Sequence, residues 1–461
     1  MNEATPRLTR ALLDAPSAPV RIVHLGLGNF HRAHQAWHTH KAPDAHDWGI
    51  AAFTGRRPDM ARALAPQDGL YTLITRDSGG DTFDVVRSIV AVHASDEHEA
   101  FLGYLRRAEV AIVTMTLTEH AYLRNGDGGL DTGRAEVTAD VEALENGRPV
   151  QTLPGRLLAG LLARRSAEAG PIALLSCDNL PDNGDVTRRI VTDLARIAAP
   201  EALDWIERNV DFATSMVDRI TPATTDEDIA LVAREQGYDD VSPVPTEPFS
   251  EWVVSGTFPA GRPTWEAAGV QLASDVAPHE RRKLWLLNGS HSLLAYTAPL
   301  LGHRTIDEAI ADARCLEWVN TFWDEAQRNL GLSDDLVGQY RQDLLDRYGN
   351  TGVRHHLAQI AYDGSQKLPV RTLPTALAER EAGRLPAGAA TTLAGWVLHL
   401  RGQGAPVQDA GAGPAQEAAG AEDLTEAATG VLNTLRAGLG QDAELVNVVA
   451  ERVQYLQGLV A

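Results

Sequence analysis

Arg21-Ile22-Val23-His24-Leu25-Gly26-Leu27-Gly28-Asn29-Phe30-His31 is the stretch that decides the fold. Its β-branched, apolar first half predicts a buried strand, and its two glycines predict a tight turn into a helix. Glycines at these places let the backbone approach a pyrophosphate at a helix N-terminus. His31 stands where this fingerprint usually has a third glycine, so a simple tight turn remains the structural alternative.

Strand-like and helix-like segments alternate after this turn. Further strands are predicted at 48–53, 110–117 and 172–176, with helices at 96–107 and 155–169 between them. This order predicts an α/β fold with a Rossmann-like, doubly wound parallel sheet.

The pattern becomes mainly α-helical near residue 275, so we predict two domains, 1–275 for the dinucleotide and 276–461 for substrate and catalysis. Helices are predicted in the second domain at 280–296, 306–330, 334–347, 387–401 and 443–459. The Ala- and Gly-rich segment 403–422 is predicted to be a mobile surface loop.

Composition limits the class of protein. A formal net charge of −21 argues against a nucleic acid or an anionic membrane as partner, and a highly soluble acidic surface is sufficient to explain it. Two cysteines, no signal peptide and no long apolar run predict a cytoplasmic protein. The oligomeric state stays open, with a monomer among the alternatives.

Lysine is rare in this chain: among 41 basic residues only Lys41, Lys283 and Lys367 are lysine. Lysine can lose its proton near neutral pH when it is buried, which arginine cannot do. On an α-helix, Lys283, Asn288 and His291 lie at about 0°, 140° and 80° and share one broad face. They suit removal of a proton from an alcohol, with Lys283 as general base and an amide and an imidazole at the oxyanion. A structural role for all three is the alternative.

Other dehydrogenase chemistries find little support. Two distant cysteines and no His-Glu-x-x-His offer little of the ligand set that a zinc-dependent alcohol dehydrogenase needs. No tyrosine has a lysine four residues later, as short-chain dehydrogenases require.

The loop after the second strand leaves the choice between NAD and NADP open, because Asp59 favours NAD whereas Arg56 and Arg57 would suit NADP.

Six motifs resemble the polyol-specific long-chain dehydrogenases, which include mannitol 2-dehydrogenase and fructuronate reductase. They are the turn at 24–35, Ser176-Cys177-Asp178-Asn179-Leu180-Pro181-Asp182-Asn183-Gly184, Met216-Val217-Asp218-Arg219-Ile220-Thr221-Pro222, Gly261-Arg262-Pro263, the Lys283-x4-Asn288-x2-His291 pattern, and Asp363-Gly364-Ser365-Gln366-Lys367-Leu368-Pro369. They occur in order over about residues 20–400.

The resemblance implies a Rossmann-like domain, a mainly helical domain and a metal-free active site between them. It implies Lys283 as general base, and Asn288, His291 and Asn179 around the oxyanion. Glu280 would exchange the proton, and Asp218 and Lys367 would bind substrate hydroxyls. The implied nucleotide site comprises Gly26, Gly28, Asn29, Phe30, Arg32 and Asp59, with Thr118 and Glu119 near the nicotinamide. Surface placement is the alternative for Glu280, Thr118 and Glu119.

Substrate choice within the family depends on two departures. Gln359 occupies a position where mannitol 2-dehydrogenases usually have arginine. Arg371 could receive a sugar carboxylate, and an exposed or structural arginine is the alternative. The expected reaction is NAD(P)-dependent interconversion of an open-chain polyol or aldonate with its ketose or ketouronate. Mannitol with fructose and mannonate with fructuronate are the leading pairs, and a non-catalytic NAD(H) sensor is the rival.

Overall fold

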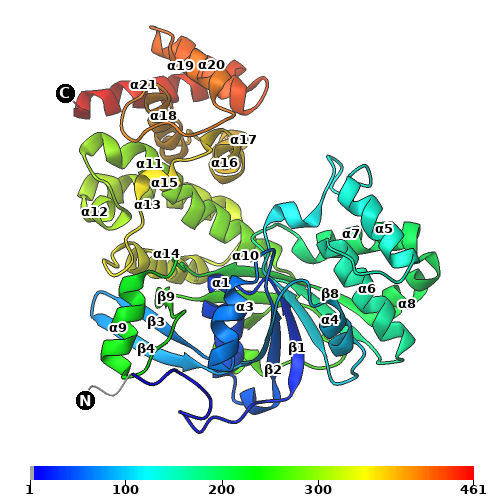
Figure 1. Cartoon of the computed structure of the whole chain (residues 1–461). Helices are drawn as coiled ribbons and strands as arrows, with labels where there is room; N and C mark the ends of the chain where they lie inside the picture. Colours follow the sequence, from blue (N-terminus) through cyan, green and yellow to red (C-terminus); the bar gives the residue numbers. More distant parts are fainter. Residues whose placement is uncertain (1–4, 461) are drawn as a thin grey trace. The chain divides into compact units, whose positions relative to one another are not determined.

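A computed structural model describes residues 5–460 of the chain. These residues form two compact units, with the division between Ala277 and Pro278. Each unit is described by itself below, and its helices and strands can be followed in Figure 1.

The first unit is built, within residues 5–277, on a sheet of eight strands in the order β11-β10-β8-β7-β6-β1-β2-β5. The strands are β1 (Val20–Leu25), β2 (Gly49–Phe53), β5 (Ile89–His93), β6 (Ile112–Met115), β7 (Ile172–Ser176), β8 (Val210–Asp218), β10 (Glu251–Ser255) and β11 (Gln271–Leu272). From β5 to β8 all neighbours pair in parallel, as predicted. The sheet is nevertheless mixed, because β10 returns antiparallel to β8.

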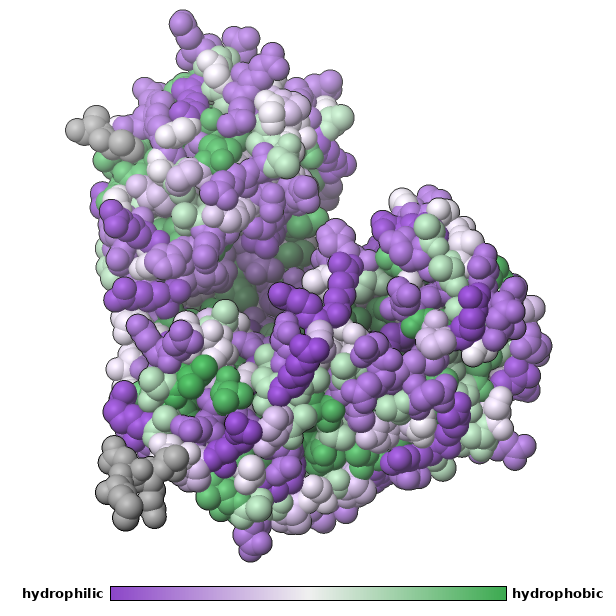
Figure 2. Space-filling view, viewed as in Figure 1, coloured by the Kyte–Doolittle hydropathy of each residue, from purple (hydrophilic) through white to green (hydrophobic). Residues whose placement is uncertain are grey.

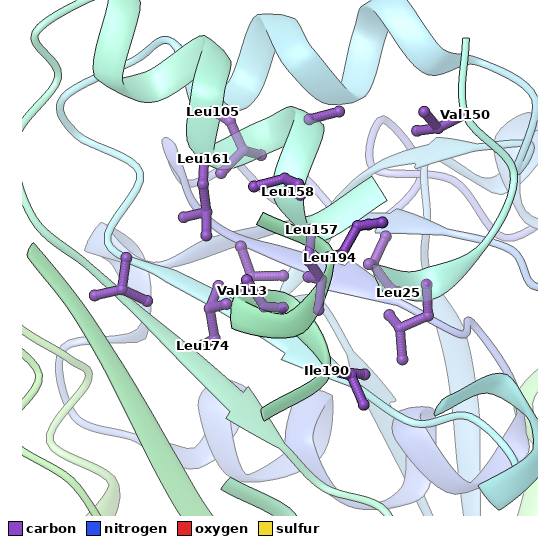
Figure 3. Close-up of a cluster of buried hydrophobic side chains, with 14 of the residues drawn as sticks. Leu25, Leu105, Val113, Val150, Leu157, Leu158, Leu161, Leu174, Ile190 and Leu194 are labelled. Atoms are coloured by element: carbon purple, nitrogen blue, oxygen red, sulfur yellow. The ribbon is translucent and has the colours of Figure 1, made fainter. Parts of the chain in front are cut away.

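Helices cover both faces of the sheet, which makes it doubly wound. One face carries α1 (Asn29–Ala33), α2 (Gln35–Lys41) and α3 (Asp59–Leu64), and the other carries α4 (His98–Leu105), α5 (Ala135–Glu145), α6 (Leu153–Ser166), α7 (Asn183–Ala198) and α8 (Leu203–Asn209). Side chains alternate between the two faces, as a strand requires. In Figure 3, Leu25, Val113 and Leu174 of the strands lie with leucines of α6 and α7 in one buried cluster.

A second, small sheet adds elements that the periodicity did not predict. It contains β3 (Tyr71–Asp77), β4 (Gly80–Val86) and β9 (Val244–Thr246), and α9 (Asp226–Gln236) lies between β8 and β9 in the chain. Lys41 at the end of α2 contacts β4 here, with its Nζ 2.5 Å from an Asp84 carboxylate oxygen. This ion pair gives Lys41, the lysine that belongs to none of the motifs, a structural role.

The second unit is helical. Its elements are α11 (Gly289–Thr297), α12 (Ile306–Ala311), α13 (Ala313–Leu330), α14 (Asp334–Tyr348), α15 (Leu357–Ile360), α16 (Gly364–Arg371), α17 (Leu373–Glu381), α18 (Ala387–Leu400), α19 (Gly413–Ala419), α20 (Leu424–Leu435) and α21 (Ala443–Val460). Every residue of α11 is buried, because α13, α15, α16 and α18 pack around it. Gly364 makes one of these contacts possible, since a Cβ there would lie 2.4 Å from Tyr296 Oη.

Two helix predictions need correction. The stretch 306–330 is two helices, because Asp312 ends α12 and its side chain then caps α13 by accepting from Arg314 N. The segment 403–422 contains α19 and is held to the unit, since Asp409 accepts hydrogen bonds from the backbone N and the hydroxyl of Ser365. An Ala- and Gly-rich composition therefore did not mean an unstructured loop here.

The surface agrees with the composition. Figure 2 shows hydrophilic residues over most of the visible face of both units, in keeping with the net charge of −21. None of the helices in the described chain has the length and apolar character needed to cross a bilayer.

The buried carboxylate of Glu325 predicts a pH-dependent stability. Its oxygens accept hydrogen bonds from Gly388 N at 2.7 Å and Ala389 N at 2.9 Å, at the start of α18. Burial raises the pKa of Glu325 from 4.5 to about 7. The folded state therefore holds this proton to higher pH than the unfolded state, and stability is lost as pH rises from about 4.5 to about 7.

Calorimetric melting of wild type and Glu325→Gln at pH 5, 6 and 7.5 tests this expectation. Relative to the variant, the wild type should lose stability as the pH rises, because glutamine does not titrate. A stability difference that stays constant over this range would contradict it.

Candidate functional site

The turn after β1 requires glycine at position 26. Gly26 has φ +106°, and a Cβ there would lie 2.0 Å from the carbonyl oxygen of Thr116, at the end of β6. The backbone N–H groups of Gly26 and Leu27 donate to the carbonyl of Phe53 at the end of β2. The turn is thus fixed between the two strands that flank β1.

Gly28 has a different reason to be glycine. Its backbone is extended (φ −138°, ψ −173°), and the nearest atom to an added Cβ would be Gly26 O, at 3.7 Å. The protein itself therefore leaves room at Gly28, and no side chain caps the N-terminus of α1 that follows. Open space and uncapped N–H groups at this place fit a pyrophosphate.

The residues next to the turn mostly hold the turn itself. Asn29 Nδ2 donates to Pro222 O and to Thr224 Oγ1, each at 3.1 Å, and the buried Arg32 guanidinium donates to Asn29 Oδ1 at 2.6 Å. Arg32 therefore supports a nucleotide site indirectly, through Asn29. The Phe30 ring stacks on His34, with ring centroids 5.0 Å apart.

His31, at the place of the third glycine, is fully buried. Its ring stacks on His24 of β1, with centroids 3.3 Å apart and planes 9° from parallel. Close packing of helix on strand, which the third glycine normally permits, is achieved here by two flat rings.

The loop after β2 exposes residues that would suit NAD and residues that would suit NADP. Asp59 is exposed at the start of α3, and Arg56 and Arg57 are exposed before it. A hollow of about 510 Å³ lies between Asn29, Met60 and residues 221–226. It adjoins both the glycine turn and α3, where a ribose and its base would lie.

The other predicted residues of this unit lie at or just beyond the carboxyl ends of neighbouring strands. Thr118 follows β6, Asn179 follows β7 and Asp218 ends β8, and these strands are neighbours. Thr118, Glu119 and Asn179 are exposed, whereas Asp218 is buried. Parallel strands present their carboxyl ends together, so this is the edge at which such sheets bind ligands.

Sequence reasoning missed a buried carboxylate at the same edge, that of Asp178. One of its oxygens accepts the hydrogen bond of Leu117 N, and the other accepts from Tyr122 Oη at 2.5 Å. The residue lay inside a quoted motif, but no spacing distinguished it from a surface aspartate.

In the second unit, Lys283 begins and Asn288 ends a π-helical turn, Lys283–Asn288, which joins α10 (Ala277–Arg282) to α11. An α-helix would place these two residues about 140° apart. A π-helix has i→i+5 hydrogen bonds and a wider turn, so residues five apart come onto the same side. The side chains of Lys283 and Asn288 therefore point in more similar directions than they would on an α-helix. Glu280 lies in α10, one turn before Lys283.

His291 follows in α11 and is 7% exposed. Its ring lies between Tyr348 and His355, each with a centroid 5.0 Å away, and makes no hydrogen bond within the described chain. Burial, together with His355, Arg347 and Arg371, holds the pKa of His291 well below 6.5. The imidazole is therefore neutral at neutral pH and can donate one hydrogen bond without being an acid.

The helix α16, which packs against both α11 and the π-helical turn, carries two cations, and one of them, Arg371, acts on the charge of His291. Lys367 Nζ donates to Ile360 O at 3.3 Å. The Arg371 guanidinium has no hydrogen bond or ion pair within the described chain. Burial lowers the pKa of both groups, and they also repel each other. Gln359 is exposed on α15.

Metal-binding side chains do not converge in residues 5–460: no group of three His, Cys, Asp or Glu could hold an ion there.

Two family models match the chain. The mannitol dehydrogenase Rossmann domain matches residues 20–267, and the mannitol dehydrogenase C-terminal domain matches residues 275–457.

Individual relatives agree with these models. An uncharacterised oxidoreductase of Escherichia coli (strain K12) is 37% identical over 415 residues, covering 88% of this chain and 82% of the relative. The D-mannonate oxidoreductase of the same strain is 35% identical over 392 residues, covering 83% and 80%.

Solved structures are similar over nearly the whole chain. A substrate-free D-sorbitol dehydrogenase has a TM-score of 0.90 at 28% identity, covering 98% of this chain and 99% of that one. The ternary complex of Pseudomonas fluorescens mannitol 2-dehydrogenase with NAD and D-mannitol has a TM-score of 0.76 at 30% identity, covering 99% and 96%.

The two glycines of the turn should respond differently to alanine. Gly26→Ala should lose more than about 3 kcal/mol of stability, because it combines a forbidden φ with a clash against backbone. Gly28→Ala should stay within about 1 kcal/mol of wild type but bind NADH at least about tenfold more weakly, because its methyl group would occupy the ligand's space. Melting curves and NADH fluorescence titrations measure both, and normal NADH affinity in Gly28→Ala would contradict the assignment.

Proposed function

Because this chain belongs to the mannitol dehydrogenase family, we propose that it is an NAD-dependent oxidoreductase acting on open-chain polyols or aldonates. It interconverts a secondary alcohol with the corresponding ketose or ketouronate. The observation that carries the proposal is the π-helical turn, which puts Lys283 and Asn288 on one side directly before a neutral, hydrogen-bond-free His291.

Lys283 is the general base. Its unprotonated amine takes the hydroxyl proton of the substrate, and it returns a proton to the carbonyl oxygen in the reverse direction. The Asn288 amide and the His291 imidazole donate hydrogen bonds to the same oxygen while negative charge develops on it. Bound NAD supplies the acceptor for the hydride that leaves the substrate carbon.

Further residues complete the proposed site. Asn179 joins the oxyanion donors, Glu280 exchanges the proton of Lys283, and Asp218 and Lys367 bind substrate hydroxyls. Thr118 and Glu119 border the nicotinamide, and Gly26, Gly28, Asn29 and Phe30 form the nucleotide turn. These roles rest on the motifs in the sequence and on the positions of the residues at strand and helix ends.

NAD is the cofactor that the glycine turn and the Rossmann-like sheet support. Asp59 suits the ribose hydroxyls of NAD, and Arg56 and Arg57 keep NADP as the alternative. The two cysteines, Cys177 and Cys315, are both free and buried, and we place the enzyme in the reducing cytoplasm.

A sugar acid is the substrate that Arg371 favours. A half-buried guanidinium without an acidic partner costs free energy unless a ligand supplies the counter-charge. Lys367, one turn earlier on α16, also forms no ion pair within residues 5–460. Arginine can bind a carboxylate through two parallel hydrogen bonds. D-Mannonate oxidoreductase is among the relatives, so mannonate with fructuronate is the specific pair proposed. Mannitol with fructose is the alternative.

A non-catalytic NAD(H) sensor on the same fold is the rival of another class. It would bind NADH but oxidise it with no ketose or ketouronate. The intact Lys283, Asn288 and His291 favour the enzyme.

Lys283 provides the direct test of mechanism. Lys283→Ala should lower kcat by more than about a thousandfold while NADH still binds, because no other base replaces the amine. Lys283→Arg should be nearly as inactive, since arginine keeps its proton. Lys367→Arg is the matched control, and it should mainly raise KM. Turnover near that of wild type in Lys283→Ala would exclude the mechanism.

Arg371 provides the test of substrate class. Reduction of fructose and of fructuronate should be followed with NADH and with NADPH, without added metal. We expect fructuronate to be preferred, and Arg371→Gln to raise its KM by at least about tenfold while the KM for fructose changes little. Arg354→Gln, at an exposed arginine of the same unit, is the control for net charge. Equal losses for both substrates would contradict carboxylate binding by Arg371.

A further inference from the structure

Asp178 is a buried acid that the proposed reaction does not use. It is 5% exposed, directly after β7. Its carboxylate joins the ends of two neighbouring strands, because it accepts from Leu117 N just beyond β6 and from Tyr122 Oη in the short helix Glu119–Tyr122. Tyr122 Oη also lies 2.6 Å from Ser176 Oγ of β7.

The backbone of Asp178 is fixed as firmly as its side chain. Asn183 Nδ2 donates to Asp178 O at 3.0 Å and to Ser215 O at 2.7 Å, which ties the segment to β8. The carboxylate therefore occupies one defined place at the edge of the sheet.

The groups around this carboxylate in the described part of the chain are neutral or acidic. The titratable groups that face it are Tyr122 and Glu119 from the short helix and Cys177 from its own segment. None of them is positive, and no Arg, Lys or His of the described chain forms an ion pair with Asp178. A buried, ionised carboxylate in such surroundings favours any positive charge that comes near it.

The sheet topology indicates which ligand brings that charge. The strand order reverses between β1 and β6, and dinucleotides bind across such a switch point, with one mononucleotide on each side. The glycine turn and Asp59 belong to the side of β1 and β2, where the adenosine half binds. The nicotinamide half then lies over the ends of β6 and β7, where Asp178 is buried. The ring of NAD⁺ carries a positive charge that NADH lacks.

We propose that Asp178 is a positioning residue that discriminates between the two redox states of the cofactor: its buried carboxylate favours the cationic nicotinamide of NAD⁺ over NADH. The hydrogen bonds to Leu117 N and Tyr122 Oη hold the charge at this place and order the segment that carries Thr118 and Glu119. This inference rests on the proposed NAD-dependent function but not on the identity of the substrate.

The charge of Asp178 changes near neutral pH. Burial raises its pKa to about 7, and the hydrogen bonds from Tyr122 and Leu117 oppose that rise. The carboxylate is therefore ionised above about pH 7, where it favours NAD⁺, and neutral below it, where the preference disappears.

The test measures Kd for NAD⁺ and for NADH on the whole chain, without substrate, from pH 5.5 to 8.5. In wild type, the ratio Kd(NADH)/Kd(NAD⁺) should rise at least about fivefold through neutral pH, the effect of one charge at short range. In Asp178→Asn this rise should be absent, because asparagine does not titrate. A rise equal to that of wild type in the variant would overturn the proposal.

Tyr122→Phe is the second variant, and it tests the proposal even if Asp178→Asn does not fold. It keeps the carboxylate but removes one donor to its ionised form, so the midpoint of the rise should move to higher pH. A midpoint that stays in place would count against Asp178 as the titrating group. The failure of both nucleotides to bind to wild type would instead contradict the proposed function itself.

Discussion

The first unit depends on the close approach of the glycine turn to the end of β6. Because the turn at Gly26 touches the backbone of Thr116, β1 and β6 end at the same level. The contact places the uncapped start of α1 beside the segment that carries Thr118. The ends of β7 and β8 continue this row because both strands run parallel to β6.

In the second unit, a local departure from α-helical geometry has the comparable role. A helix containing Lys283, Asn288 and His291 was predictable from the apolar pattern, but the π-helical turn within it was not. Periodicity cannot reveal such a turn, because one extra residue in a buried helix changes the direction of side chains without changing the composition. The turn is held by tertiary contacts: α16 and α13 both pack against it, and Trp323 of α13 donates to the carbonyl of Leu286 within it.

The sequence predicts those elements of the fold that are determined by neighbouring residues, and it misses those that depend on residues far apart in the chain. The strands at 21–25, 48–53 and 172–176 are buried on both faces, so their apolar runs identified them. The hairpin of β3 and β4 has polar outer positions, and the antiparallel direction of β10 depends on the path of the chain through α9 and β9. Neither cause is visible in a short window of sequence. Candidate residues that lie in a sequence motif could be found because a motif is also local. The burial of Asp178 and the lack of an acidic partner for Arg371 within residues 5–460 depend on residues far away in the sequence, so only the structure revealed them.

The two units share one electrostatic feature that carries the functional argument furthest. Within residues 5–460, Asp178 is a buried acid that forms no ion pair with a cation, and Arg371 is a half-buried base that forms none with an anion. Asp228, a buried carboxylate in the same unit as Asp178, does form an ion pair, with Arg76. Glu379, buried in the second unit, is paired with both Arg328 and Arg384. Pairing is not the rule for buried charges, however, because Glu325 is also buried and has hydrogen bonds but no ion pair within residues 5–460. Asp178 and Arg371 are singled out by their positions: they have opposite signs and match the charges that the proposed reactants bring, a cationic nicotinamide and a sugar carboxylate.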